Sequence, residues 1–347
     1  MATFWFIIDV IFWVGFFILE GFDFGVGALH SAVGRTETER RVAVNSIGPF
    51  WDGNEVWLIV AGAVIFAAFP LWYATMFSTF YLALILVLAA LLVRGVSFEW
   101  RSKDIDPRWV GTWRWSLTLG SVLLPLLIGV ALGDLLCGLP IDAAHQFTGN
   151  FFTLLQPYGL WTGVTFLALT LVSGATFLAI KTTGVVQERA ASLAPRLGWV
   201  ATALVLGFAV WTGVVTSSGV VPSLIDGIAV LAIAGASWAS SQRADGWAFA
   251  SASIATAATV TLLFANLYPH VMVSSTNAAY TLTVHGTASP PYTLKVMTVV
   301  AVIFTPFVLA YQAWNFWVFR KRLASSGAEV AGPPASGSTS TQAGSPS

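Results

Sequence analysis

Nine apolar stretches, each close to the 20 or so residues that cross a membrane as a helix, take up most of this chain. Of its 347 residues, 56% are hydrophobic and only 9% are charged, whereas a soluble domain carries about 25% charged residues. We therefore predict an all-α integral membrane protein with nine transmembrane helices. The predicted spans are 4–30, 48–69, 72–96, 114–137, 157–181, 197–217, 222–241, 246–268 and 293–319.

Lysine and arginine residues alternate between the two sides of these spans. Fifteen of the 16 lie at or after the ends of spans 1, 3, 5, 7 and 9, and Lys295 is the exception. Because basic residues are enriched in cytoplasmic loops, the amino terminus is expected outside and the carboxyl terminus in the cytoplasm. The formal net charge is zero, so nothing in the composition suggests nucleic acid as a partner.

The order of the spans suggests two four-helix bundles plus one peripheral helix. Residues 20–24 in span 1 resemble residues 173–177 in span 5, four spans later, as two repeats related by an axis along the membrane normal would require. The predicted units are 1–137 (first bundle), 138–268 (outer loop and second bundle), 269–322 (outer loop and ninth span) and 323–347. The last unit is rich in Ala, Ser, Gly, Pro and Thr and is expected to be a disordered cytoplasmic tail.

Four carboxyl groups interrupt the first two spans. Glu20 and Asp23 lie inside span 1, while Asp52 and Glu55 lie near the start of span 2. A charge at a helix centre in the membrane costs about 2.5 kcal/mol or more, and residues three apart share a helix face. We expect the four groups to face one another in the cytoplasmic half. Burial and proximity favour the protonated form of a carboxyl group, so such a cluster suits a proton pathway.

Other interpretations stay open for several acids. Asp52 and Glu55 could only cap span 2, since acids suit a helix amino terminus. Glu99 is interpreted as part of a surface ion pair with Arg94 or Arg101. Three further acids lie near outer span ends, and no chemistry is assigned to them: Asp9, Asp134 and Asp226.

The histidines do not form a haem site by their positions. His30 is expected at the inner surface, and the other three lie in outer loops or at span ends: His145, His270 and His285. No two of them share the depth that axial haem ligands need, so we expect no haem bound by this chain alone, and no metal. Most Trp residues sit at span ends as an interfacial belt, although Trp51 and Trp57 could contact a quinone or a partner subunit.

Several motifs resemble subunit II of the cytochrome bd-type quinol oxidases, over nearly the whole chain to about residue 320. The element Trp-Asp-Gly-Asn at 51–54 is the most specific of them. The matching segments are Glu20–Gly27, Arg40–Ile47, Gly48–Trp57, Phe69–Tyr73, Arg94–Arg101, Thr148–Leu155, Ser274–Thr276 and Leu294–Thr298.

This resemblance implies a haem-free subunit paired side by side with a haem-bearing subunit I in a bacterial cell membrane. Subunit I would carry two b-type haems and one d-type haem. The complex would oxidise quinol (menaquinol or ubiquinol) and reduce oxygen to water. A small single-span subunit and membrane lipids are further expected partners. The resemblance assigns the proton pathway to Asp23 and Asp52, with Glu20 beside them at a position that relatives commonly fill with Asp.

Two alternative functions remain open from the sequence. A proton-coupled secondary transporter also uses intramembrane carboxylates, although no pair of broken helices stands in corresponding places of the two halves. A purely structural partner of the haem subunit would use the same carboxylates only for packing.

The predicted topology can be tested with a reporter fused after Arg322. Because basic residues follow span 9, the reporter should be cytoplasmic. An external reporter would overturn the topology and place the carboxylates on the wrong side for proton uptake.

Overall fold

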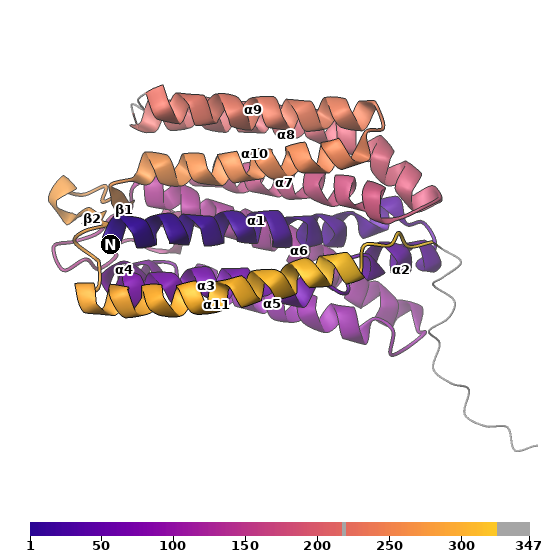
Figure 1. The fold of residues 1–347 in the computed structure, drawn as a ribbon, viewed down its shortest axis with the longest axis horizontal. Coiled ribbons are helices and arrows are strands. Elements are labelled where there is room, and N and C mark those ends of the chain that lie inside the picture. Colours follow the sequence, from indigo (N-terminus) through magenta and orange to yellow (C-terminus); the bar gives the residue numbers. More distant parts are fainter. Residues whose placement is uncertain (217–219, 325–347) are drawn as a thin grey trace, which may run out of the picture.

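The computed structural model describes residues 1–216 and 220–324, which are almost entirely helical. Eleven α-helices, two 3-10 helices and two short strands follow one another along this part of the chain (Figure 1). Their bounds are α1 Ala2–Val33, α2 Glu37–Asn45, α3 Trp51–Ala68, α4 Pro70–Thr79, α5 Tyr81–Trp100, α6 Pro107–Cys137, η1 Phe151–Leu154, α7 Pro157–Lys181, α8 Val185–Thr216, α9 Val220–Ser241, α10 Asp245–Leu267, β1 His270–Met272, η2 Ala278–Tyr280, β2 Leu282–Thr283 and α11 Pro291–Val318.

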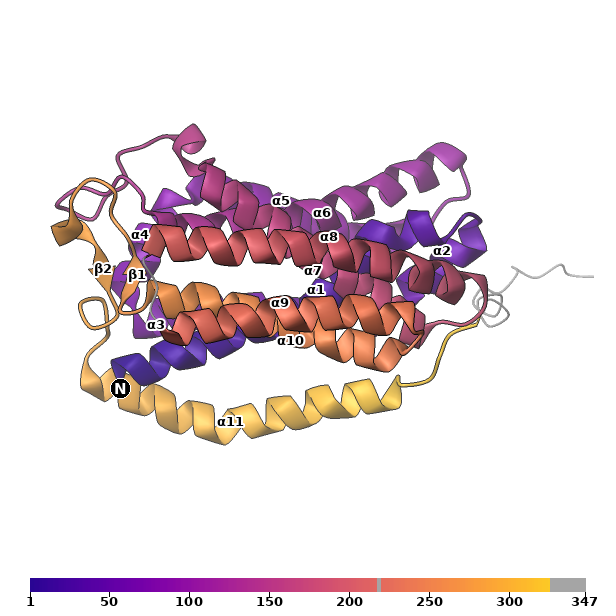
Figure 2. The same ribbon diagram turned by 90° about the horizontal axis from the view of Figure 1, so that it is seen from above.

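Nine of the helices in the described ranges are long and apolar enough to cross a membrane, which confirms the predicted number of spans. They are α1, α3, α5, α6, α7, α8, α9, α10 and α11, and they run along one common direction (Figures 1 and 2). Helices α1 and α8 have 32 residues each. At a rise of 1.5 Å per residue they are about 48 Å long, well beyond the roughly 30 Å of hydrocarbon.

The predicted third span, 72–96, is wrong at its start. Its first residues belong to α4, and the helix is interrupted at Phe80 (φ −90°, ψ 15°) before α5 begins. The Phe80 side chain is buried in the core, and two polar residues, Ser78 and Thr79, directly precede it. A hydropathy averaged over the roughly 20 residues of a span does not resolve these two positions, and α5 extends to Trp100 instead of ending at 96.

Helix α2 is a short element that the prediction of spans did not include. Its first turn forms a capping box, in which the Thr36 hydroxyl accepts from the Glu39 N–H and the Glu39 carboxylate accepts from the Thr36 N–H. Three residues of α2 are buried: Val42, Ala43 and Val44. Helix α2 thus covers the end of the molecule where α1 finishes and α3 begins (Figure 2).

Helices α1 and α7 cross closely at the centre of the fold. A Cβ on Gly25 would lie 2.0 Å from the Thr170 carbonyl oxygen, and one on Gly174 would lie 2.3 Å from the Gly25 carbonyl carbon. Small residues at both positions let the two backbones touch. Beside this crossing, the rings of Phe22 and Phe177 stack with centroids 4.2 Å apart.

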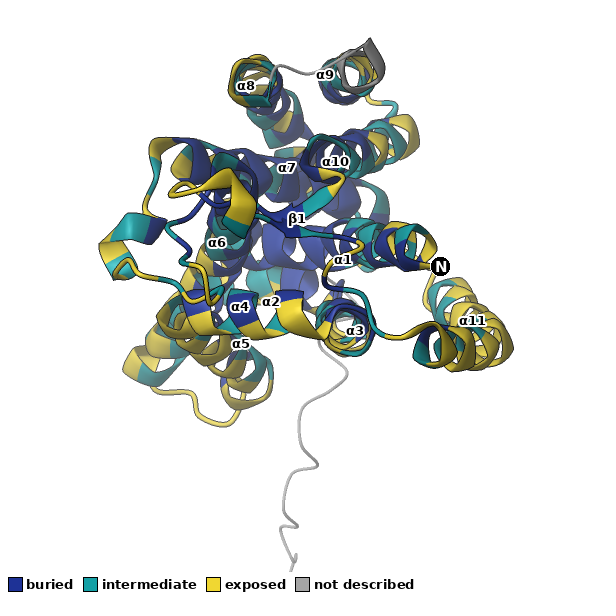
Figure 3. Ribbon diagram, turned by 90° about the vertical axis from the view of Figure 1, so that its left-hand side faces the viewer, coloured by how far each residue is buried: buried dark blue, intermediate teal, exposed yellow. Residues whose placement is uncertain are grey.

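The contacts of α1 extend across the boundary between the two predicted bundles. Helix α1 packs against α3 and α6, but also against α7 and α10. Buried residues gather where these helices meet (Figure 3). The division into bundles at residues 137 and 138 accordingly stays a prediction.

Helix α11 lies at the edge of the molecule, with Leu294 as its only buried residue (Figures 2 and 3). The chain after it is held in place, because the Leu323 N–H donates to the Lys181 carbonyl (2.8 Å) and the Thr183 N–H donates to the Leu323 carbonyl (3.0 Å). The start of the predicted tail at residue 323 is therefore too early. The rest of that predicted tail, 325–347, lies outside the described residues.

The loops that follow α6 and α10 pack together at the opposite end of the molecule from α2. The Leu139 N–H donates to the Val273 carbonyl (2.9 Å), and the Ser275 N–H donates to the Leu139 carbonyl (2.9 Å). Strands β1 and β2 pair in antiparallel fashion beside this contact (Figure 1). The loops after α6 and α10 thus form one ordered cap.

Glu39 offers a test of how α2 is attached to α8. The hydrogen bond from Arg189 (2.7 Å), together with those from the Arg35 and Thr36 N–H groups, holds the pKa of the Glu39 carboxyl below its ordinary value. Glu39→Gln should lower the thermal stability of the purified protein at neutral pH, by at most about 1 kcal/mol for a partly exposed pair. The difference should vanish as the pH falls through the lowered pKa of Glu39, because the wild-type carboxyl is then protonated too. A pH-independent difference would show that charge is not involved.

Candidate functional site

Glu20 and Asp23 lie one helical turn apart in α1, and both side chains are fully buried. Because they are three residues apart, they lie on the same face of the helix. They sit in the third quarter of α1, toward the end of the molecule that α2 covers (Figure 1). Their burial agrees with their predicted place inside the first span.

Arg94 of α5 is the positive charge that faces these acids, and it is fully buried as well. Its Nη1 lies 2.6 Å from Glu20 Oε1 and 3.4 Å from Glu55 Oε2. The guanidinium carbon also lies 4.8 Å from the centroid of the Phe24 ring and 5.2 Å from that of Phe98. The site therefore joins residues from α1, α3 and α5 around one cation.

The interpretation of Arg94 as a surface residue paired with Glu99 is wrong. Arg94 lies within α5, seven residues before the C-cap residue Arg101. At this position Gly120 of α6 lets the two helices approach each other. A Cβ on Gly120 would lie 3.0 Å from both the Ala90 carbonyl oxygen and Arg94 Cβ. Arg101 pairs instead with Glu37 of α2 (3.3 Å).

The two acids of α3 differ in exposure. The Glu55 side chain is 21% exposed and contacts Arg94, whereas Asp52 is exposed in the chain. The expectation that Asp52 faces the first span is therefore wrong. Two residues along the helix turn the side chain by about 200°, so Asn54 takes the inward position instead.

Asn54 connects the acids to the peripheral helix α11. Its Nδ2 donates to Asp23 Oδ2 (2.7 Å) and to the Leu19 carbonyl oxygen (3.1 Å). Its Oδ1 accepts from Gln312 Nε2 (2.8 Å). This amide is fully buried, and all of its usual donors and its acceptor oxygen are engaged.

Asn54, Arg94 and Gln312 were not assigned to the site from the sequence. The signal for Asn54 was available, because it lies at helical spacing from the buried residues Ala61, Ile65 and Ala68. No comparable signal marks Gln312, since α11 is exposed over most of its length.

The charges of the cluster do not balance. Three carboxyl groups, those of Glu20, Asp23 and Glu55, share the single guanidinium of Arg94. Two of the guanidinium nitrogens, Nε and Nη2, have no hydrogen-bond partner within the described chain. Protons on the carboxyl groups would supply the missing positive charge, so the arrangement is suited to taking up and releasing protons.

His30 is buried, which corrects its expected position at the inner surface. Helix α1 continues past it to Val33, and His30 Nδ1 donates to the Gly27 carbonyl oxygen (2.7 Å). Within the described residues, no group of three or more His, Cys, Asp or Glu side chains could hold a metal ion.

Trp51 and Trp57 pack within this chain. Trp51 stacks on Phe98 with centroids 4.6 Å apart. Trp57 lies 5.8 Å from the Phe12 ring and covers Gly15, where a Cβ would come within 2.3 Å of the indole. The contact of either ring with a quinone or a partner subunit stays a prediction.

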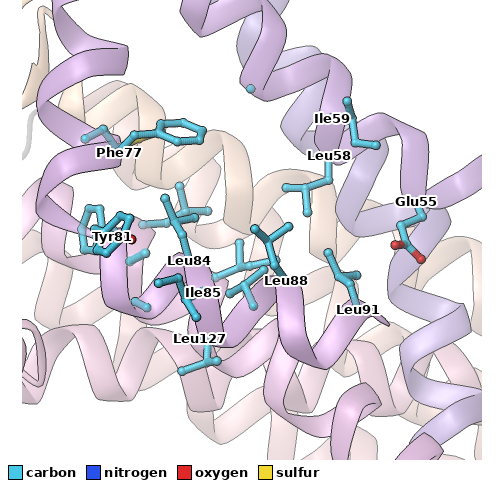
Figure 4. Close-up of a pocket in the computed structure, with 18 of the residues that line it drawn as sticks. Glu55, Leu58, Ile59, Phe77, Tyr81, Leu84, Ile85, Leu88, Leu91 and Leu127 are labelled. Carbon is cyan, nitrogen blue, oxygen red and sulfur yellow. The ribbon is translucent and has the colours of Figure 1, made fainter. Parts of the chain in front are cut away.

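A cavity of about 1040 Å³ lies between α3, α4, α5 and α6. Glu55 stands at one end of it and Tyr81 at the other, with leucine and isoleucine side chains between them (Figure 4). Neither Trp51 nor Trp57 lines it. Such an apolar space suits a hydrocarbon chain rather than a row of water molecules.

Comparisons with known proteins agree with one another. The family model described as cytochrome bd terminal oxidase subunit II matches residues 1–319. Cytochrome bd ubiquinol oxidase subunit 2 of Bacillus subtilis is 41% identical over 323 residues, covering 92% of this chain and 96% of the relative. Cytochrome bd-I ubiquinol oxidase subunit 2 of Escherichia coli is 38% identical over 350 residues, covering 90% and 92%.

A solved structure has the same fold. A chain of bd oxidase from Geobacillus thermodenitrificans superposes with a TM-score of 0.67 at 16% sequence identity. The match covers 92% of this chain and 99% of that one. At this identity the likeness shows the fold alone.

Arg94→Met should strongly destabilise the protein, because it leaves buried carboxyl groups without their counter-charge. Removing one partner of a buried pair costs about 3–5 kcal/mol. The double variant Arg94→Met, Glu20→Gln should regain part of that loss, since it removes the unpaired acid as well. Thermal unfolding and the yield of folded protein measure both effects. A single variant as stable as the wild type would show that the guanidinium does not hold the cluster together.

Proposed function

Because the chain belongs to the family of cytochrome bd terminal oxidase subunit II, we propose that it is the haem-free subunit of a quinol oxidase and supplies protons for oxygen reduction. Its partner would be a haem-bearing subunit I in the bacterial cell membrane. The observation that carries the proton role is the cluster formed by the buried acids Glu20 and Asp23 and the partly exposed Glu55 around the buried Arg94.

The reaction explains why such a cluster would be kept. Reduction of oxygen to water consumes a proton for every electron, and an uncompensated charge is costly in a medium of low dielectric constant. Buried charges are also costly in themselves, and a buried ion pair is weak evidence for stability. Intramembrane acids are by default markers of ion or proton routes.

Arg94 would keep the acids charged enough to exchange protons. The guanidinium stays protonated in proteins, so its contact with Glu20 at 2.6 Å favours a carboxylate there. Asn54 donates to Asp23 Oδ2 and stabilises a carboxylate at that position as well. A proton can then move between neighbouring carboxyl groups while the total charge near Arg94 changes little.

The exposure of the acids suggests the course of the path. Glu20 and Asp23 are fully buried, Glu55 is partly exposed, and Asp52 is exposed. The acids thus lead from the interior to the surface of α3. We assign Asp52 to the place where the path leaves this chain, toward water or the partner subunit.

The cofactors and the orientation are further parts of the proposal. The described histidines support a haem-free chain, because His30 is engaged by the Gly27 carbonyl and the other three lie near the outer cap. We assign two b-type haems and one d-type haem to subunit I, and menaquinol or ubiquinol as the electron donor. The basic residues place the amino terminus outside and the cluster in the cytoplasmic half. A small single-span subunit and lipids are proposed as further partners.

The other two candidate functions are less well supported. No observation specifically favours a proton-coupled transporter, whereas the family match over residues 1–319 favours an oxidase subunit. A purely structural role for the acids would explain the ion pair. Substitution of Asp23 separates that structural role from proton supply.

Asp23→Asn keeps the shape of the side chain but removes the titrating group. In the purified complex, quinol oxidase turnover per haem should fall several-fold while haem content stays near that of the wild type. Asp52→Asn should have the same effect. Oxygen consumption and the haem spectrum of the same sample provide the two measurements.

Asp134→Asn is the matched control, because Asp134 is also fully buried but lies near the outer end of α6. Its turnover per haem should match the wild type. Loss of haem or of assembly in Asp23→Asn, with unchanged turnover per haem, would indicate a structural role. Unchanged turnover in the double variant Asp23→Asn, Asp52→Asn would reject the proton path.

A further inference from the structure

Helix α11 is peripheral, yet it reaches the buried acids through one side chain. Gln312 Nε2 donates to Asn54 Oδ1 at 2.8 Å, and Asn54 Nδ2 donates to Asp23 Oδ2 at 2.7 Å. Two hydrogen bonds therefore join an exposed helix at the edge of the molecule to a carboxyl group at its centre (Figure 3).

We propose that Gln312 is a positioning residue of the oxidase, which holds the Asn54 amide in the orientation that donates to Asp23. This inference rests on the proposed role of Asp23 in proton supply. It extends the site from α1, α3 and α5 to α11, which would then take part in function in addition to covering the edge of the fold.

The hydrogen-bonding capacity of Asn54 leaves little freedom. Both amide N–H groups are used, on Asp23 Oδ2 and on the Leu19 carbonyl, and the amide oxygen accepts from Gln312. If the amide turned over, its oxygen would face two other acceptors. If Gln312 were absent, the oxygen would be buried without the donor seen here, and a buried unpaired acceptor is costly. Without Gln312, the Asn54 amide would lose the contact that fixes its oxygen, and its hydrogen bond to Asp23 would be less well held.

The direction of the two hydrogen bonds also matters. Gln312 donates to Asn54, and Asn54 donates onward to Asp23, so each bond polarises the next. The donor that reaches Asp23 is stronger because its own oxygen is hydrogen-bonded. A residue on α11 can thus influence a carboxyl group that it does not touch.

Neighbouring contacts fix the position of Gln312 along α3. One turn further on, Asn315 Nδ2 donates to the Pro49 carbonyl oxygen (3.0 Å). Next to it, the Phe316 ring stacks on Phe50 with centroids 4.6 Å apart. These contacts anchor the inner end of α11, while Gln312 alone of the three contacts Asn54.

The test compares two substitutions of Gln312 in the purified complex. Gln312→Met keeps the length of the side chain but removes the donor. Gln312→Glu keeps its shape and places an acceptor against Asn54 Oδ1. The turnover number per haem should fall several-fold in Gln312→Met and further in Gln312→Glu, while the KM for quinol stays unchanged. An unchanged turnover number in both variants would overturn the proposal.

Two further variants separate positioning from packing. Asn315→Leu removes an anchor of α11 without touching Asn54, and its turnover per haem should match the wild type. In a background of Asn54→Leu, Gln312→Met should cause no additional loss, because its effect passes through Asn54. An additional loss of the same size in that background would overturn the proposal.

Failure of the proposed function gives a different pattern. If Asp23→Asn itself leaves turnover unchanged, the proton role of Asp23 is rejected and this inference with it. If Asp23→Asn slows turnover but Gln312→Met does not, only the role of Gln312 is rejected.

Discussion

The ion pair between Arg94 and Glu20 is the interaction on which the half of this structure nearest α2 depends. Both side chains are fully buried, and their charged atoms lie 2.6 Å apart. The desolvation of two such charges commonly outweighs their attraction, so an apolar pair of similar volume would serve packing at least as well. Its presence is therefore best explained by function, and the helices around it are arranged to keep it out of the membrane and of water.

Three features of the packing allow this burial. Gly120 lets α6 approach the backbone of Arg94, and Gly25 lets α7 approach the segment of α1 that follows the acids. The rings of Phe24 and Phe98 cover the guanidinium. As a result, the Arg94 guanidinium is enclosed by aromatic rings and carboxyl groups. On the side of α11, the Asn54 amide lies between Asp23 and Gln312 and hydrogen-bonds to both.

Hydropathy and charge predicted the number of spans and the burial of Glu20 and Asp23, because the cost of exposing apolar surface or burying charge depends on composition. They failed where three-dimensional packing decides. A helix is interrupted at Phe80 within a stretch whose average hydropathy is that of a single span. Arg94 resembles the basic residues of cytoplasmic loops, yet it is buried by its neighbours. Which of Asp52 and Asn54 points inward depends on the rotation of α3 about its axis. The contact of Gln312 with Asn54 depends on where α11 packs.

If the buried acids supply protons, they gain and lose them as the oxidase turns over. Infrared difference spectra of the complex, recorded between its oxidised and reduced states in H2O and in D2O, test it directly. We predict a carboxyl C=O stretching band that shifts in D2O and is absent in Glu20→Gln. Identical carboxyl bands in the wild type and in variants of Glu20 and Asp23 would contradict it, since the cluster would then keep one protonation state throughout the reaction.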